Sequence, residues 1–213
     1  MIRQEGLSLK TDGDPKARFR ILAILTRLRR LCCASELVAT GRNPGSSRID
    51  ALMERAEELK ESGHKALIFS QFTDVLAIVE KRMKEAGHSY LYLDGSTPRG
   101  RRAELVKSFQ SGKADFFLIS LKAGGVGLTL TESDYVILPD PWWNPVVDNQ
   151  AADRSHRIGR KNPVTVYRLV CSDTVEENVL AIHEEKKALL DTLINDSSNA
   201  GPLSPSELIE LMR

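Results

Sequence analysis

From residue 65 onward the sequence alternates between short apolar runs and helical segments. The apolar runs are 66–69, 90–93, 115–120 and 135–138, and helical patterns at 73–86 and 97–109 stand between them. Near-continuous apolar strands that alternate with helices are typical of a parallel β-sheet with both faces covered. A last run, 164–170, alternates in polarity, which predicts a strand at the edge of that sheet. The pattern therefore predicts an α/β fold.

Two helical segments precede this region. Residues 16–33 carry an apolar helical stripe, and a second stripe begins after Ser47, which resembles the N-cap of a capping box. We expect a flexible arm over 1–15, a helical lead-in over 16–63, a helix-sandwiched parallel sheet over 64–195, and a linker with a short terminal helix over 196–213. Capping-box patterns at 174–177 and 204–207 support helices in the C-terminal part.

Composition excludes several classes of protein. The chain has 213 residues, of which 41% are hydrophobic and 28% charged, as in an ordinary globular protein. The net charge of +1 neither supports nor excludes nucleic-acid binding, because a nearly neutral chain can still carry a local basic patch. Histidines and cysteines show no metal-ligand spacing, and no apolar run is long enough to span a bilayer. We expect Cys32, Cys33 and Cys171 to be reduced, buried and apolar in role.

Polar loops follow the predicted strands, at the edge where open α/β sheets bind ligands. Ser120 and Lys122 open a glycine-rich loop whose backbone could approach a phosphate. This loop matches neither the dinucleotide fingerprint nor the Walker A pattern. A tight turn of purely structural role is the alternative.

Two further loops carry groups suited to nucleic acid. The turn at 94–98 is followed by Arg99, Arg101 and Arg102, and cations at a helix start oppose its dipole unless an anion binds nearby. The loop 140–145 holds both tryptophans of the chain, which could stack on bases or pack in the core. Simple surface charge is the alternative for the arginines.

A helix expected after Asn144-Pro145 carries Gln150, Arg154 and Arg157 at spacings of four and three residues. This spacing places the three side chains on one helical face. Paired guanidinium groups suit the charge of a phosphoryl group in transfer. A solvated face with an ion pair between Asp153 and Arg157 is the competing interpretation.

Together these segments resemble motifs IV to VI of the Swi/Snf-type ATPases, DNA translocases of helicase superfamily two. The resemblance rests on 69–72, 93–97, 120–129, 140–145 and 150–159, in the family's order, and covers roughly residues 20–195. It implies the second of two RecA-like lobes, with ATP in the cleft between them. Mg and most of the nucleotide would be held by a first lobe that this sequence lacks. A bacterial member is expected, because the loops are short.

The resemblance also implies roles for individual residues. Arg154 and Arg157 would be arginine fingers, and Gln150 would orient them or the attacking water. The nucleotide edge would include Gly125, Gly127 and Thr129. The side facing the DNA backbone would include Ser70, Gln71, Gly95, Ser96, Arg102, Ser120, Lys122 and Trp143.

Two positions depart from the family pattern. Arg160 stands where the family has glutamine, as in DEAD-box RNA helicases, and we expect it at the surface. Thr129 stands where asparagine is common in the family. This difference affects the contact with the nucleotide ribose that the resemblance implies for this position.

The expected function is the second motor lobe of a double-stranded DNA translocase, inactive as an ATPase by itself. The expected partners are duplex DNA and the N-terminal lobe of the same protein, with no membrane and no oligomer. The cytoplasm is the expected location, with the nucleoid or the nucleus depending on the organism. A non-enzymatic DNA- or partner-binding lobe, and a nucleotide-sugar or dinucleotide enzyme of similar architecture, are the alternatives.

Overall fold

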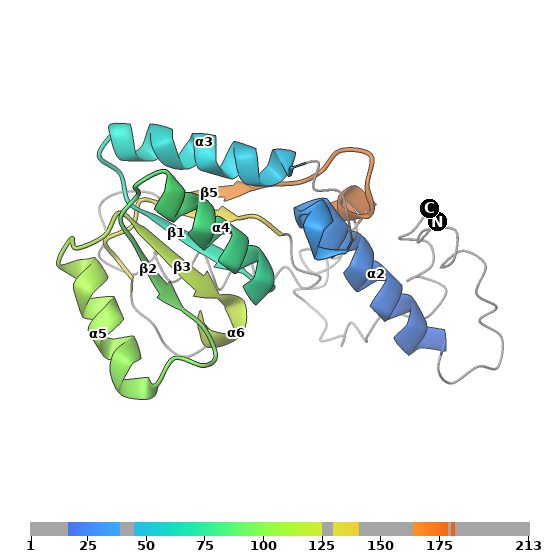
Figure 1. Ribbon diagram of the computed structural model, residues 1–213, viewed down its shortest axis with the longest axis horizontal. Helices are drawn as coiled ribbons and strands as arrows, with labels where there is room; N and C mark the ends of the chain where they lie inside the picture. The colour runs from blue at the N-terminus through green and yellow to red at the C-terminus, as the bar shows by residue number, and fades with distance from the viewer. Residues whose placement is uncertain (1–16, 39–44, 125–129, 141–163, 179, 182–213) are drawn as a thin grey trace, which may run out of the picture. The chain divides into compact units, whose positions relative to one another are not determined.

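The computed structural model describes residues 17–38, 45–124, 130–140, 164–178 and 180–181 (Figure 1). The chain divides into two compact units. The smaller unit combines residues 1–43 with 171–213, and the larger unit covers 44–170. The boundaries expected from the sequence, at 15, 63 and 195, remain predictions.

The larger unit contains a parallel sheet of five strands in the order β2-β3-β1-β4-β5 (Figure 1). The strands are β1 (Ala66–Ser70), β2 (Tyr90–Leu93), β3 (Phe116–Ser120), β4 (Tyr135–Leu138) and β5 (Thr165–Arg168). Every neighbouring pair is parallel. The predicted α/β class and parallel sheet are confirmed.

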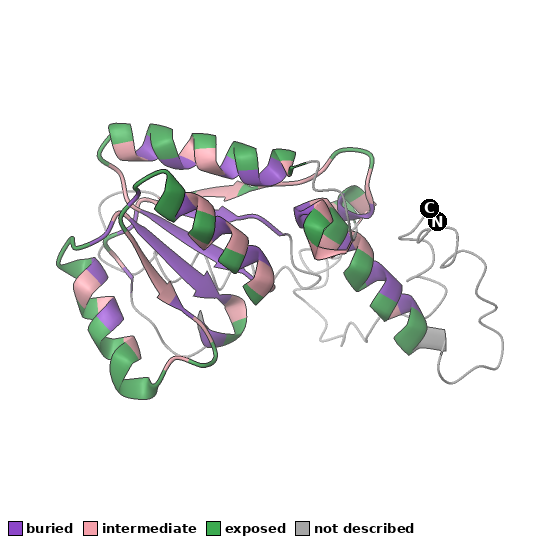
Figure 2. Cartoon of the chain, in the orientation of Figure 1, coloured by how far each residue is buried: buried purple, intermediate pink, exposed green. Residues whose placement is uncertain are grey.

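Burial explains which strands lie inside the sheet. All residues of β1 and β3 are buried, so their apolar side chains pack on both faces (Figure 2). In β5 the two end residues are exposed and the two central ones half-buried. The strand order places β5 at one edge of the sheet, which confirms the edge position that the alternating polarity of 164–170 predicts.

Two apolar layers cover the sheet. Leu67, Phe69, Phe117 and Ile119 belong to a core cluster that includes Leu105 and Phe109 of α5 (Arg99–Gln110). The alternate side chains of the strands point to the opposite face. On that side α3 (Ser47–Glu61) packs against α4 (Thr73–Glu85), whose residues Val75, Leu76, Val79 and Met83 are fully buried. Each such side chain contributes roughly 1.5–3 kcal/mol by leaving water.

Helices α3 and α4 end in the same way, on a glycine with positive φ. Gly63 has a φ of 72° and Gly87 a φ of 71°. Their backbone N–H groups, and those of the next residues, donate to carbonyls of the last helical turn, such as His64 N to Leu59 O at 2.8 Å. The left-handed conformation favours glycine here and turns the chain towards the next strand.

Two helix starts differ from expectation. The N-cap of α3 is Ser46, whose Oγ accepts from Ile49 N at 3.2 Å, so the assignment of the cap to Ser47 was wrong by one residue. The helix expected from residue 97 begins at Arg99, with Pro98 as its N-cap, and the Oγ1 of Thr97 accepts from Asp94 N at 3.1 Å. In α3 the neighbouring hydroxyl residues Ser46 and Ser47 suit the same position, which local pattern does not resolve.

In its described residues the smaller unit contains α2 (Ala17–Cys33), a 3-10 turn, η1 (Ser35–Leu37), and helical residues at 175–178 and 180–181. Helix α2 confirms the helix expected over 16–33, and its buried side includes Ile21, Ile24 and Leu25. After β5 the chain returns to this unit at Cys171. Cys33 is buried as expected, whereas Cys32 and Cys171 are only half-buried.

Candidate nucleic-acid and nucleotide interface

The carboxyl ends of β1, β2 and β3 meet at one edge of the sheet. Ser70 and Ser120 are paired in register at the ends of β1 and β3, and Leu93 at the end of β2 pairs with Ile119. Since the strands are parallel, the loops that follow them open at the same edge. The structure therefore brings six predicted site residues to one edge: Ser70, Gln71, Gly95, Ser96, Ser120 and Lys122.

The hydroxyls of Ser70 and Ser120 are buried and hold the turns that follow them. Ser70 Oγ accepts from Phe72 N at 3.0 Å and donates to Phe72 O at 3.1 Å. Ser120 Oγ accepts from Ala123 N at 3.3 Å. The two hydroxyls thus have a structural role in this conformation, and their contact with DNA stays a prediction.

The loop after β2 is organised by one carboxylate. Asp94 Oδ1 accepts from Ser96 N at 2.9 Å and from Ser96 Oγ at 2.6 Å. These bonds from Ser96, with weaker ones from Thr97, lower the pKa of Asp94, although partial burial opposes the shift. The side of Gly95 is open, because a Cβ atom added there would meet nothing within 4 Å.

Arg102 of α5 ties the same loop to its helix. Its Nε donates to Thr97 O at 2.8 Å, and its Nη2 lies 3.4 Å from Asp94 O and 3.3 Å from Gly95 O. All three acceptors are neutral backbone carbonyls, and none of them is a carboxylate. Sequence reasoning expected a DNA-side role and missed this structural one.

Two buried charged residues that sequence reasoning missed hold the loop after β4. Asp140 is 1% exposed, and its Oδ2 accepts from Gln71 N at 3.0 Å. Arg48 of α3 is 4% exposed, and its Nη1 donates to Pro139 O at 2.7 Å. The burial of Arg48 could have been predicted from the sequence, because Arg48 lies four residues before Leu52 and so on the apolar face of α3.

The remaining predicted residues lie outside the part of the chain that the structure describes. They are Gly125, Gly127, Thr129, Trp143, Gln150, Arg154, Arg157 and Arg160. Lys122, at the start of the glycine-rich loop in α6 (Leu121–Gly124), is described and exposed.

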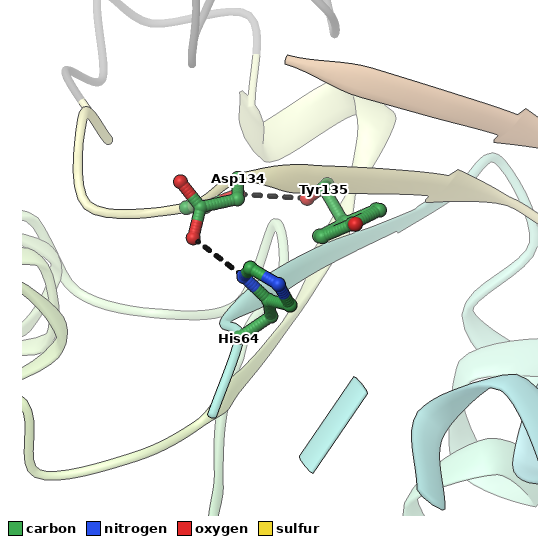
Figure 3. Close-up of polar contacts among 4 residues, drawn as sticks. His64, Asp134 and Tyr135 are labelled. Carbon is green, nitrogen blue, oxygen red and sulfur yellow. Dashed lines mark hydrogen bonds and ion pairs between the residues drawn. The ribbon is translucent and has the colours of Figure 1, made fainter. Parts of the chain in front are cut away.

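A histidine–carboxylate pair lies at the opposite, amino edge of the sheet (Figure 3). His64 Nδ1 is 3.2 Å from Asp134 Oδ2, and the ring of Tyr135 lies edge-on to the imidazole at 5.0 Å. Asp134 N also donates to Lys65 O at 3.2 Å. These contacts join the starts of β1 and β4, so the pair has a structural role.

The described residues offer neither a metal site nor a membrane-spanning helix. They contain no group of three or more His, Cys, Asp or Glu side chains placed to hold a metal ion. In the same residues no helix is both long and apolar enough to cross a membrane.

The chain is similar to helicases and remodelling ATPases in sequence. Residues 47–159 match the family described as helicase conserved C-terminal domain. An uncharacterized ATP-dependent helicase of Mycoplasma pneumoniae is 37% identical over 98% of this chain and 20% of its own length. The human SWI/SNF-related matrix-associated actin-dependent regulator of chromatin subfamily A member 1 is 38% identical over 100% of this chain and 22% of its own. The chain thus spans about a fifth of the length of these relatives.

Solved structures agree with the sequence comparison. The Sulfolobus solfataricus SWI2/SNF2 ATPase C-terminal domain has a TM-score of 0.75 and 27% identity, covering 98% of this chain and 89% of that one. The ATPase core domain from the same organism has a TM-score of 0.78 and 29% identity, covering 98% and 44%. Its core in complex with double-stranded DNA has a TM-score of 0.73 and 28% identity, covering 91% and 41%. The chain belongs to the helicase conserved C-terminal domain family, as the RecA-like C-terminal lobe of the Swi/Snf type.

Proposed function

We propose that the chain is the second motor lobe of an ATP-dependent translocase that acts on duplex DNA. The observation that carries this proposal is the correspondence with a SWI2/SNF2 C-terminal domain over nearly the whole of both chains. The related core in complex with double-stranded DNA supports DNA as the polymer. A bacterial origin stays a prediction, since relatives of similar identity come from Mycoplasma pneumoniae and from Homo sapiens.

The carboxyl edge of β1–β3 is the proposed DNA side. Lys122 offers an exposed ammonium, and the open side of Gly95 lets a sugar-phosphate backbone approach the loop. Arg102 adds a guanidinium whose donors partly satisfy the loop carbonyls. Contacts of this kind position the protein on phosphates and carry no sequence information, so we expect little sequence preference.

The proposed nucleotide side comprises six residues that the family resemblance assigns to it: Gln150, Arg154, Arg157, Gly125, Gly127 and Thr129. ATP supplies the phosphoanhydride bond that is hydrolysed. Guanidinium groups suit its γ-phosphate, because they are permanently charged and donate paired hydrogen bonds. We assign Mg to the first lobe of the same protein, as the resemblance to the two-lobed ATPases implies.

The decisive experiment is Arg157→Ala in the full-length protein. DNA-stimulated hydrolysis should fall by about 10³–10⁵, the typical contribution of an arginine finger. Nucleotide affinity should change little, because the first lobe holds most of the nucleotide. Arg55→Ala is the matched control, since Arg55 lies on α3 and its guanidinium stacks on Tyr167 at 5.0 Å.

Hydrolysis near the wild-type rate in Arg157→Ala would refute the finger assignment. If the wild-type protein bound duplex DNA in a salt-dependent manner but never hydrolysed ATP, the chain would instead be a non-enzymatic DNA-binding lobe.

A further inference from the structure

Two cysteines that are 139 positions apart in sequence meet in the smaller unit. Cys32 lies near the end of α2, and Cys171 begins the segment that follows the sheet. Cys171 Sγ donates to Cys32 O at 3.4 Å, and the two side chains are hydrogen-bonded to each other. Both residues are half-buried, so small solutes can reach them.

Cys33 provides a natural contrast. It is adjacent to Cys32 but fully buried, with 0% of its surface exposed. Successive residues of an α-helix point about 100° apart, so only one of the two thiols can face Cys171. Helix geometry therefore selects Cys32.

The backbone around Cys171 is held on both sides. Its N–H donates to Glu176 Oε2 at 3.1 Å, and its carbonyl accepts from Thr174 Oγ1 at 2.8 Å. Glu176 is itself fully buried. Because this turn is already ordered, bringing the two sulfur atoms together costs little conformational entropy.

The environment of Cys32 makes its thiol a weaker acid than usual. The pKa of Cys32 is raised, first by its hydrogen bond with Cys171, then by burial and by the Glu176 carboxylate. Because Cys32 keeps its proton, we assign the first attack on the oxidant to Cys171.

We propose that Cys32 and Cys171 form a dithiol site that hydroperoxides oxidise to a disulfide. In the first step Cys171 thiolate attacks the terminal peroxide oxygen and the O–O bond breaks. The other oxygen leaves as alkoxide, or as hydroxide from hydrogen peroxide, and takes a proton from solvent to give the alcohol or water. The product is a sulfenic acid on Cys171. In the second step Cys32 sulfur attacks that sulfur, and the departing hydroxide takes the Cys32 proton as water. Two thiols and one hydroperoxide give one disulfide, one water and one alcohol, or two waters from hydrogen peroxide, so atoms and two electrons balance.

The disulfide would close a covalent loop that contains the whole sheet-bearing unit, residues 44–170. It would link the helix before that unit to the segment after it. A loop of this length removes much entropy from the unfolded chain, so the oxidised form is the more stable one. This site is independent of the proposed motor function.

The test is oxidation of the native protein with hydrogen peroxide, followed by alkylation and tryptic mapping without reductant. We expect one cross-linked pair, peptide 31–42 joined to peptide 169–186, whose fragmentation assigns Cys32 and not Cys33. Dithiothreitol should remove it. Oxidation should raise Tm by roughly 5–15 °C. Cys33→Ala is the matched control and should still form the cross-link.

Sulfenic acid trapping distinguishes the roles of the two thiols. In Cys32→Ser a 1,3-dione should label Cys171, whereas in Cys171→Ser it should leave Cys32 unlabelled. The proposal is overturned if the native protein yields no cross-link before sulfinic acid accumulates, or if the cross-link joins Cys33. Labelling of Cys32 in Cys171→Ser would overturn the assignment of the attacking thiol.

Discussion

Arg48 and Asp140 show how buried charges hold a loop that the sequence leaves undetermined. Arg48 extends from α3 to the carbonyl of Pro139, and Asp140 accepts from the backbone of Gln71. Each contact joins segments far apart in sequence. A charged side chain is retained at a buried position only when it is hydrogen-bonded, because desolvation is otherwise too costly.

Arg48→Ala should lower the free energy of unfolding by about 1–3 kcal/mol, because it leaves the buried Pro139 carbonyl without this donor. Urea unfolding measures the loss. Arg101→Ala is the control: Arg101 pairs with Glu104 at the surface, where the loss should stay under about 0.5 kcal/mol. Equal losses in the two variants would contradict the role assigned to Arg48.

His88 makes stability depend on pH. Burial lowers the pKa of His88. The Glu57 carboxylate, whose Oε2 lies 3.2 Å from His88 Nε2, opposes this shift. Of two smaller effects, that of Lys60 lowers the pKa and that of Asp115 raises it. The unfolded chain, with a histidine pKa of about 6.5, therefore binds this proton more readily than the folded protein. The contribution to stability is complete above that value and is lost as pH falls towards the folded pKa.

Urea unfolding at about pH 7.5 and about pH 5.5 should show a larger loss of stability in the wild type than in His88→Gln, which cannot titrate. Identical pH dependence in the two proteins would show that His88 does not titrate differently on folding.

At the scale of elements, the apolar pattern of the sequence predicted most strand ends to within one residue. Strands β2 and β4 have the predicted bounds, and β1 and β3 each differ by one residue. Buried strands are readable because each carries an uninterrupted apolar run. Caps were less readable, because adjacent hydroxyl residues such as Ser46 and Ser47 suit the same position, and only the path of the chain selects one.

Ser46→Ala should destabilise the protein by about 1 kcal/mol, through loss of the bond from Ile49 N. Ser47→Ala is the matched control and should cost less, because alanine is a favourable residue in the first helical turn. Thermal unfolding of both variants decides between the two serines. A larger loss of stability in Ser47→Ala than in Ser46→Ala would show that Ser47, as the sequence suggested, is the N-cap.

At the scale of the whole molecule, the parallel sheet brings motifs that are far apart in sequence to one edge of the sheet. The loops after β1, β2 and β3 come together there, and the proposed motor function requires a first lobe to complete the nucleotide site. The sequence contains no Walker A pattern. We therefore expect negligible ATP hydrolysis by the 213-residue chain, with or without duplex DNA, in a phosphate-release assay. ATP hydrolysis that co-purifies with the chain and rises in proportion to its concentration would contradict the proposal.

The sequence alone determined the class of fold, the parallel sheet and the edge strand, because short-range periodicity and uninterrupted apolar runs encode them. It also indicated the family through its motifs. Only the tertiary structure decided the strand order and the contacts between Gln71 and Asp140, Arg48 and Pro139, and Cys32 and Cys171. Those pairs are 69, 91 and 139 residues apart, so no local pattern relates their members. They meet because the order of strands and the return of the chain after β5 bring distant backbone together.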